Sequence, residues 1–244
     1  AAYGLRKNQN GVLIIKVFDG SPTDGIFEEN DVILKIDDFD IAEDGTIQLS
    51  DDLLTDYKHA IDMHHIGDEV LVTYSRNGTE AVAKIKADAP PESYSLVKGE
   101  QFDQMPKYYI YGGVLFVPLN MNLIKRWGND WGRSAPVTLL QARNEWTSPE
   151  KHEVVVALQV LAADVNLGYH DWRNWIVDDV NGEQVRDFEH FSQIVRNNTQ
   201  ENIVLENKNG YQMVINHRAA IASEAEILAQ YRIPAAFSTD LFPE

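Results

Sequence analysis

The order of predicted structural elements is repeated along the chain, and this repeat constrains the fold more than any single motif does. Each half is expected to hold a strand, a link, a strand that ends in a turn, a helix, and two strands joined at an Asn-Gly pair. The comparison aligns Ile33 with Ile176, and the two copies then differ by one polar segment, residues 42–52, which the second lacks. A shared order with one insertion indicates two homologous modules, and chance alignment of strand-rich segments is the alternative. The predicted elements are strands 12–17, 31–36, 69–74 and 80–86 with a helix at 53–64, then strands 154–161, 175–180, 202–206 and 211–216 with a helix from Phe188.

Local signals support these elements. The β-branched apolar run at residues 12–17 is typical of a buried strand. Asn77-Gly78 predicts a tight hairpin, because both central residues of the favoured turn need positive φ. Asp187 is expected to cap the helix of the second copy, whose apolar residues recur at helical spacing: Phe188, Phe191, Ile194 and Val195.

A proline-containing linker separates the copies, and a helical extension follows them. Residues 108–119 are expected to form an aromatic strand, a Gly112-Gly113 step and a further strand. Short helices are expected at 123–127 and 137–146 with a loop at 127–136, and an alanine-rich helix at 219–231 should end before Pro234. The predicted boundaries are 1–88 for the first module, 89–105 for the linker, 106–218 for the second module and 219–244 for the C-terminal helix and tail.

Charge and composition argue against several functions. The 244 residues carry a formal net charge of −17, from 38 acidic and 21 basic residues. Such a surface repels phosphate backbones, so nucleic acid is not an expected partner. There is no cysteine, which excludes disulfides, thiol catalysis and zinc–thiolate sites. No apolar run reaches the roughly 18 residues of a membrane span, and membrane insertion is not expected.

Candidate catalytic and metal-binding groups do not form a complete set. His64 and His65 are adjacent, and His152 lacks the second His four residues on that a helical zinc pair requires. Ser134 lacks the second glycine of a nucleophile elbow. The acidic run at 37–44 fails the spacing of a calcium-binding loop. We therefore expect a chain that is not an enzyme and that takes no metal or other cofactor.

Several stretches carry a resemblance to a known family. Residues 11–41, with their Gly20-Ser21-Pro22 turn, resemble a PDZ domain of the Deg/HtrA serine proteases. The resemblance narrows to the plant and bacterial subgroup with tandem PDZ domains at residues 106–119, 158–169, 180–182 and 232–241. The protease domain of that family precedes the PDZ pair, and its Gly-Asn-Ser-Gly-Gly segment is not found here. The chain thus resembles the C-terminal piece of such a protease, with the docking strand of its first PDZ domain expected upstream.

The resemblance implies a peptide-binding site in the second module. A PDZ ligand adds as a strand to a sheet edge, and backbone N–H groups of a glycine loop hold its terminal carboxylate. Residues 111–114 have the composition of that loop, residues 114–117 would be the docking edge, and residues 188–197 the opposite wall. The alternative is an ordinary bend at Gly112-Gly113 with Phe191 and Ile194 in the core. The predicted peptide-binding residues are Tyr111, Gly112, Gly113, Val114, Leu115, Phe116, His190, Phe191 and Ile194.

The expected architecture is a mixed α/β (α+β) protein of two PDZ-like modules, each a small β-sandwich or barrel with helices, plus a C-terminal helical extension. The resemblance implies a non-catalytic region that recognises unfolded or C-terminal peptide segments by strand addition and regulates a serine endopeptidase. The alternative is an oligomerisation module that does not itself bind peptide. Expected partners are peptides, the protease domain of the same polypeptide, and further copies of the parent protein. An extracytoplasmic, periplasmic location is suspected from the resemblance alone.

Overall fold

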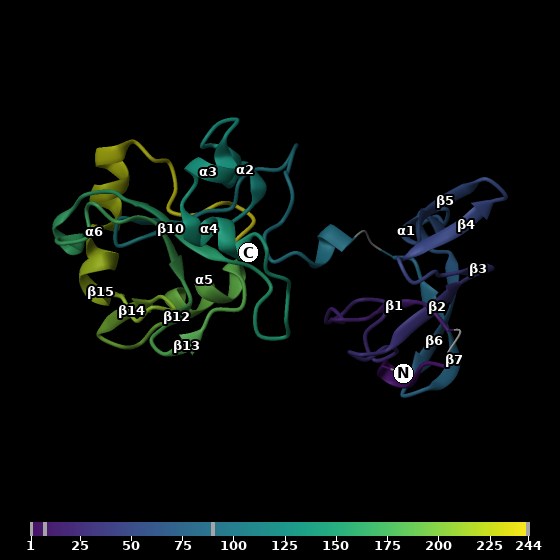
Figure 1. The fold of residues 1–244 in the computed structure, drawn as a ribbon. Coiled ribbons are helices and arrows are strands. Elements are labelled where there is room, and N and C mark those ends of the chain that lie inside the picture. The colour runs from purple at the N-terminus through teal and green to yellow at the C-terminus, as the bar shows by residue number, and fades with distance from the viewer. Residues whose placement is uncertain (1, 7–8, 89–90, 243–244) are drawn as a thin grey trace. The chain divides into compact units, whose positions relative to one another are not determined.

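The chain consists of two compact units in a computed structural model that describes residues 2–6, 9–88 and 91–242. The first unit is Ala1–Tyr94 and the second is Ser95–Glu244. Both combine antiparallel sheets with helices, which confirms the mixed α/β expectation (Figure 1). None of the sheets in the described residues closes into a barrel. The described helices include none with the length and apolarity needed to cross a bilayer.

The first unit is built on an antiparallel sheet in the order β1-β2-β6-β7, with β3 beside β2. Its core collects Phe27, Ile36, Ile47 and Val72. The predicted hairpin at Asn77-Gly78 is present, with φ of 51° and 83°. The elements are η1 (Ala2–Gly4), β1 (Val12–Leu13), β2 (Val32–Ile36), β3 (Phe39–Asp40), β4 (Thr46–Ser50), β5 (Leu53–Asp56), α1 (Lys58–Asp62), β6 (Glu69–Arg76), β7 (Thr79–Lys86) and η2 (Pro91–Tyr94).

The predicted helix at 53–64 is wrong over its first part. Leu53–Asp56 forms β5, which pairs with β4 inside the segment read as a polar insertion. Only Lys58–Asp62 is helical. The reason is tertiary, since Thr46 pairs with Asp56 and this hairpin satisfies backbone groups that a helix would otherwise satisfy.

The first strand is shorter than its apolar run. Pairing with β2 ends at Ile14, whose N–H donates to the Asp31 carbonyl over 2.8 Å. The chain before β2 turns away at Asn30, which has a φ of 76°. Residues 15–17 therefore have no partner strand there, and Ile15 is 81% exposed.

The second unit contains two four-stranded antiparallel sheets, β11-β10-β9-β8 and β13-β12-β14-β15. Side chains of both sheets and of α5 meet in one core, which includes Phe116, Phe191 and Met213. The other side of β10 packs through Val156 against a second core with Leu139 of α4. The elements are β8 (Tyr109–Tyr111), β9 (Val114–Pro118), α2 (Met121–Lys125), α3 (Trp131–Ser134), α4 (Val137–Ala142), β10 (Val155–Val160), η3 (Asp164–Asn166), β11 (Arg173–Val177), β12 (Asp179–Val180), β13 (Glu183–Gln184), α5 (Phe188–Arg196), β14 (Asn202–Glu206), β15 (Gln212–Asn216) and α6 (His217–Tyr231).

Three predictions for the second unit need correction. The strand at 175–180 is broken at Asp178 into β11 and β12, which pair with different neighbours. The loop at 127–136 contains the short helix α3. The turn at Asn209-Gly210 belongs to a longer loop, because β14 and β15 pair last at Glu206 and Gln212.

Strand register shows which positions of the two units correspond. Val12 pairs with Ile33, and Val155 pairs with Val177. The alignment that matches Ile33 with Ile176 also matches Val12 with Val155, so by strand pairing Ile33 corresponds to Val177, one residue further on. Each unit has its own core around these strands, as two homologous modules require.

Candidate peptide-binding site

The strand predicted to dock a peptide, β9, is paired along both edges. On one side it pairs with β8, where Tyr109 lies opposite Phe116 and Tyr111 opposite Val114. On the other side it pairs with β10, where Val117 lies opposite Val156. Strand addition needs a row of unpaired N–H and C=O groups. The edge assigned to a peptide at residues 114–117 is therefore taken by β8 of the same chain.

The predicted carboxylate loop is a buried hairpin turn. Gly112 and Gly113 join β8 to β9 with φ of 54° and 77°, which only glycine adopts readily in succession. A Cβ on Gly112 would lie 2.8 Å from the Ile215 side chain, and one on Gly113 would lie 2.6 Å from the Leu161 carbonyl oxygen. Tyr111 and Val114 on either side are also buried. The turn has no room for a ligand in this conformation.

Asn166, which is not among the predicted peptide-binding residues, holds the turn in place through hydrogen bonds. This asparagine is fully buried, and its Nδ2 donates to the carbonyls of Gly112 and Leu161, each over 2.8 Å. The Leu161 N–H in turn donates to the Gly113 carbonyl over 2.7 Å. The sequence shows no pattern that would mark this asparagine, because Gly112 lies 54 residues away and meets it only in the tertiary structure.

Helix α6 closes over the same turn. Ala220 and Ile227 are 1% and 2% exposed and approach the positions where Gly112 and Gly113 would carry a Cβ, at 3.6 and 3.5 Å. Two apolar residues seven apart on a predicted helix are a signal that this helix buries one face. The helix read as an extension is thus part of the wall around the predicted loop.

Helix α5 places the remaining predicted residues in different surroundings. Asp187 caps the helix as predicted, accepting from the His190 N–H over 2.7 Å. Phe191 is fully buried, with its ring centroid 4.7 Å from that of Phe116. His190 lies 3.1 Å from Glu183 through Nε2, and Ile194 packs at the core margin. Phe191 therefore packs against β9 in the core, whereas His190 faces Glu183 of β13.

The tail after α6 lies along the free edge of β8. The Ile110 N–H donates to the Ala236 carbonyl over 2.6 Å, and the Ser238 N–H donates to the Tyr108 carbonyl over 3.0 Å. Tyr109 and Phe237 form an antiparallel bridge between these bonds. The tail, coloured yellow in Figure 1, so pairs with the outer edge of this sheet through one isolated bridge.

Aromatic contacts fasten the tail to β8 and α5. The Phe242 ring lies edge-on to Tyr109 at 5.7 Å, and the Arg196 guanidinium lies 4.2 Å from the centre of the Phe242 ring. Burial, with Glu224 as a smaller cause, raises the pKa of Tyr109 to about 12. Tyr111 donates or accepts a 2.7 Å bond with His217, and burial raises its pKa as well.

Other polar groups considered in the sequence have structural partners. His64 Nε2 lies 2.6 Å from Asp37, which also accepts from the Leu71 N–H. The Ser134 hydroxyl donates to the carbonyls of Trp127 and Asp130. In the part of the chain that the structure describes, no three His, Asp or Glu side chains gather as a metal site would require.

Comparison with known proteins bears on both units. A PDZ-domain family model matches residues 97–240, more than half of the chain, and a second PDZ-domain model matches residues 3–87. Protease Do-like 4, mitochondrial, of Arabidopsis thaliana is 31% identical over 238 residues, which cover 98% of this chain and 43% of that protein. Putative protease Do-like 11, mitochondrial, of the same plant is 26% identical over 98% of this chain and 38% of its own length.

A relative outside plants is the serine protease DegP homolog of Plasmodium falciparum (isolate 3D7). It is 25% identical over 193 residues, which are 78% of this chain and 21% of the relative. The chain spans less than half the length of these curated relatives. The matched stretch carries two PDZ domains in tandem, so the chain belongs to the PDZ-domain family and its homologues are Deg/HtrA proteases.

Proposed function

We propose that the chain is the non-catalytic PDZ region of a Deg/HtrA-type serine endopeptidase, which regulates and assembles the parent enzyme. We further propose that its second PDZ domain admits a peptide only after α6 moves away from the Gly112-Gly113 turn. The observation that carries this proposal is the burial of the turn beneath Ala220 and Ile227.

Peptide recognition in this proposal follows the strand-addition mode of PDZ domains. The carboxylate of an unfolded or C-terminal segment would bind the backbone donors at residues 112–114 once the turn opens. Its chain would pair with β9 or β8 after the occupying strand leaves. Until then the domain contributes rigid surface for assembly, which is the second candidate function and is favoured by the doubly paired β9.

The same resemblance extends to partners and location. We propose that the protease domain of the parent polypeptide and further copies of it contact this region. The plant relatives named above are mitochondrial by name, and Protease Do-like 2 of the same plant is named chloroplastic. An organelle derived from bacteria is therefore the proposed location, in place of the suspected periplasm.

The test compares peptide binding by the whole chain with binding by a variant that loosens α6. Ile227→Asp puts a charge at a buried contact, and Ile221→Asp puts the same charge on an exposed position of the same helix, 61% exposed. Fluorescence polarisation with labelled peptides ending in an apolar residue should detect saturable binding only for Ile227→Asp. Circular dichroism checks that both variants remain folded.

Hydrogen exchange of the unmodified chain provides a second readout. Amides of residues 111–114 should exchange together with those of α6, since one opening exposes both. Equal peptide affinity of the unmodified chain and Ile227→Asp would contradict the closed turn. Absence of binding in both, with a mass that rises with concentration in light scattering, would favour assembly alone.

A further inference from the structure

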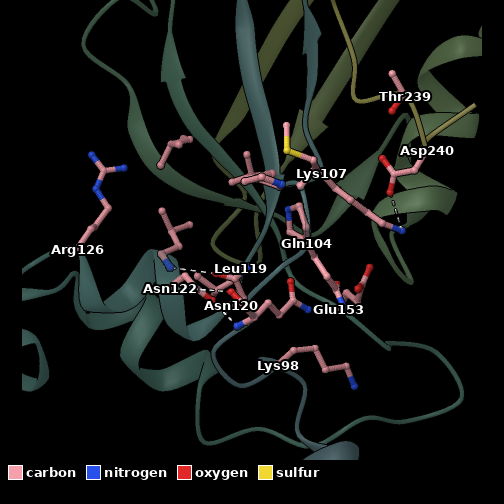
Figure 2. A pocket seen from close by; sticks show the side chains of 17 residues that line it. Lys98, Gln104, Lys107, Leu119, Asn120, Asn122, Arg126, Glu153, Thr239 and Asp240 are labelled. Atoms are coloured by element: carbon pink, nitrogen blue, oxygen red, sulfur yellow. Dashed lines mark hydrogen bonds and ion pairs between the residues drawn. The ribbon is translucent and has the colours of Figure 1, made fainter.

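A cavity of about 730 Å³ lies beside the end of β9 in the second unit, away from the closed turn. Its walls come from the coil before β8, from the start of α2, from β10 and from the tail (Figure 2). The residues on which the following argument rests are Lys98, Met105, Lys107, Leu123, Arg126 and Leu158.

The coil wall is held in place by paired amide contacts. The Gln101 N–H donates to Asn122 Oδ1 over 2.8 Å, and Asn122 Nδ2 donates back to the Gln101 carbonyl over 3.0 Å. Asn120, at the start of α2, accepts from the Leu123 N–H over 3.0 Å. A wall fixed in this way loses little conformational freedom when a ligand binds.

The cavity is locally basic on a strongly acidic chain. Lys98, Lys107 and Arg126 line it, whereas the chain as a whole carries a net charge of −17. Lys98 Nζ donates to the Ser95 carbonyl over 3.2 Å, and the two lining carboxylates also have partners. Glu153 accepts from the Phe188 N–H over 3.0 Å, and Asp240 lies 3.7 Å from Lys107 Nζ. Because that ion pair is long, Lys107 can bind a second carboxylate.

The same wall presents large apolar side chains to solvent. Met105 is 86% exposed and Phe102, on the same coil, is 70% exposed. The apolar residues Val117, Leu123 and Leu158 also line the cavity. Methionine adapts to irregular partners and is common at peptide-binding surfaces. Exposed aromatic and apolar groups next to a cavity are typical of interaction sites.

We propose that this cavity binds an extended polypeptide segment in which carboxylate side chains alternate with large apolar ones. In Figure 2, Lys98, Lys107 and Arg126 lie on different sides of the cavity and do not converge. Separated cations match several carboxylate side chains along a segment, whereas a single chain terminus would need convergent donors. The site is distinct from the Gly112-Gly113 turn and does not depend on its opening.

Binding is tested on the whole chain with three labelled peptides measured by fluorescence polarisation. The first is acetylated and amidated and alternates Glu with Leu and Phe, the second replaces each Glu with Gln, and the third has a free carboxyl end but no acidic side chain. The first should bind, its affinity should fall as salt is raised, and the other two should bind on the order of tenfold more weakly or not at all.

Matched substitutions locate the site. Met105→Ser and Arg126→Gln should each lower the affinity for the first peptide on the order of tenfold. Ile221→Ser and Arg133→Gln introduce the same two residues at exposed positions outside the cavity and should leave binding unchanged. Unchanged binding by Met105→Ser and Arg126→Gln, equal binding of the Gln peptide, or binding of the free-carboxyl peptide alone would overturn the proposal.

Discussion

In both PDZ domains the same strand is irregular at the same position. The residue at that position is Leu34 in the first unit and Asp178 in the second. In the first unit the pairing of β2 with β6 shifts between Ile33 and Lys35, so the strand continues through a bulge at Leu34. In the second unit the corresponding strand stops at Asp178, which separates β11 from β12. A bulge allows a strand to bend within one sheet. A break allows its two parts to join two sheets.

The two units also differ in which aspartate forms the stabilising polar contacts. Asp178 accepts from Lys151 Nζ over 2.6 Å and from the Lys208 N–H over 2.9 Å. The first unit has apolar Leu34 there and buries Asp31 instead, which Arg76 binds through both Nε and Nη2 at 2.9 and 2.7 Å. Homologous strands therefore keep their register while the units place an ion pair at different positions, with a buried Asp31 in the first and a partly buried Asp178 in the second.

The two units should differ most in how much stability they lose when a glycine of a tight hairpin turn is replaced by alanine. Gly113→Ala should destabilise the second unit by about 3–4 kcal/mol, because the new Cβ meets the Leu161 carbonyl at 2.6 Å inside the core. Gly78→Ala meets the Gly4 carbonyl at 2.8 Å, but η1 at the edge of the first unit can shift, so about 1–2 kcal/mol is expected. Urea unfolding measures both.

Gly210→Ala is the control for these substitutions. Gly210 has nearly the same φ as Gly113, 78° against 77°, and no atom within 4 Å of its would-be Cβ. It should lose only about 1 kcal/mol, the cost of a left-handed backbone alone. If Gly113→Ala costs no more than this control, the turn is not closed as described.

The buried ion pair of the first unit is expected to have the next largest effect. Asp31→Leu should cost about 2–3 kcal/mol, because Arg76 loses a bidentate partner and the Glu28 N–H loses its acceptor. Hydrogen exchange resolved along the sequence should show the loss in the first unit only. Glu69→Leu removes an exposed ion pair with Lys84 from the same sheet and should cost less than about 1 kcal/mol.

Replacing the residue at the strand break should cause a smaller loss of stability. Asp178→Leu gives the second unit the residue of the first and should cost about 1–2 kcal/mol, since Lys151 and the Lys208 N–H both lose their acceptor. Thermal unfolding provides the measurement. Asp171→Leu, an exposed position before β11, should change stability by less than about 0.5 kcal/mol. A neutral Asp178→Leu would show that the break does not depend on this carboxylate.

The smallest expected effect concerns pH: the contribution of Asp31 to the stability of the first unit and that of Asp179 to the second should change with pH in opposite directions. Burial raises the pKa of Asp31, but the Arg76 and Glu28 hydrogen bonds outweigh it and bring the pKa below its ordinary value. Its stabilisation is therefore present at neutral pH and lost as pH falls through that lowered pKa. Burial, then Asp178 and Glu206, raise the pKa of Asp179, so its contribution is present at low pH and lost as pH rises through the raised pKa.

Asparagine substitutions separate these two contributions. Asp31→Asn should flatten the pH dependence of the first unit, and Asp179→Asn should flatten that of the second in the opposite sense. Hydrogen exchange in each unit between about pH 3 and pH 7, corrected for intrinsic rates, measures both slopes. Slopes of the same sign in the two units would contradict the assignment.

Part of the candidate site was accessible to prediction because its signals are local. Gly112-Gly113 identifies a point where the backbone takes positive φ, and Asp187 identifies a helix start, whatever surrounds them. Whether such a turn is open is not a local property. Asn166, Ala220 and Ile227 reach it from segments far along the chain.

The duplicated PDZ order, the hairpin at Asn77-Gly78 and the helix cap at Asp187 could be predicted from the sequence, since periodicity, turn chemistry and capping act between residues close in the chain. The sequence alignment matched Ile33 with Ile176, whereas strand pairing matches Ile33 with Val177, one residue further on. Long-range packing is what makes Leu53–Asp56 a strand, puts β8 at the edge of β9, places α6 over the Gly112-Gly113 turn and pairs the tail with β8. These outcomes depend on which distant segments satisfy the same backbone groups, and that competition is settled by packing.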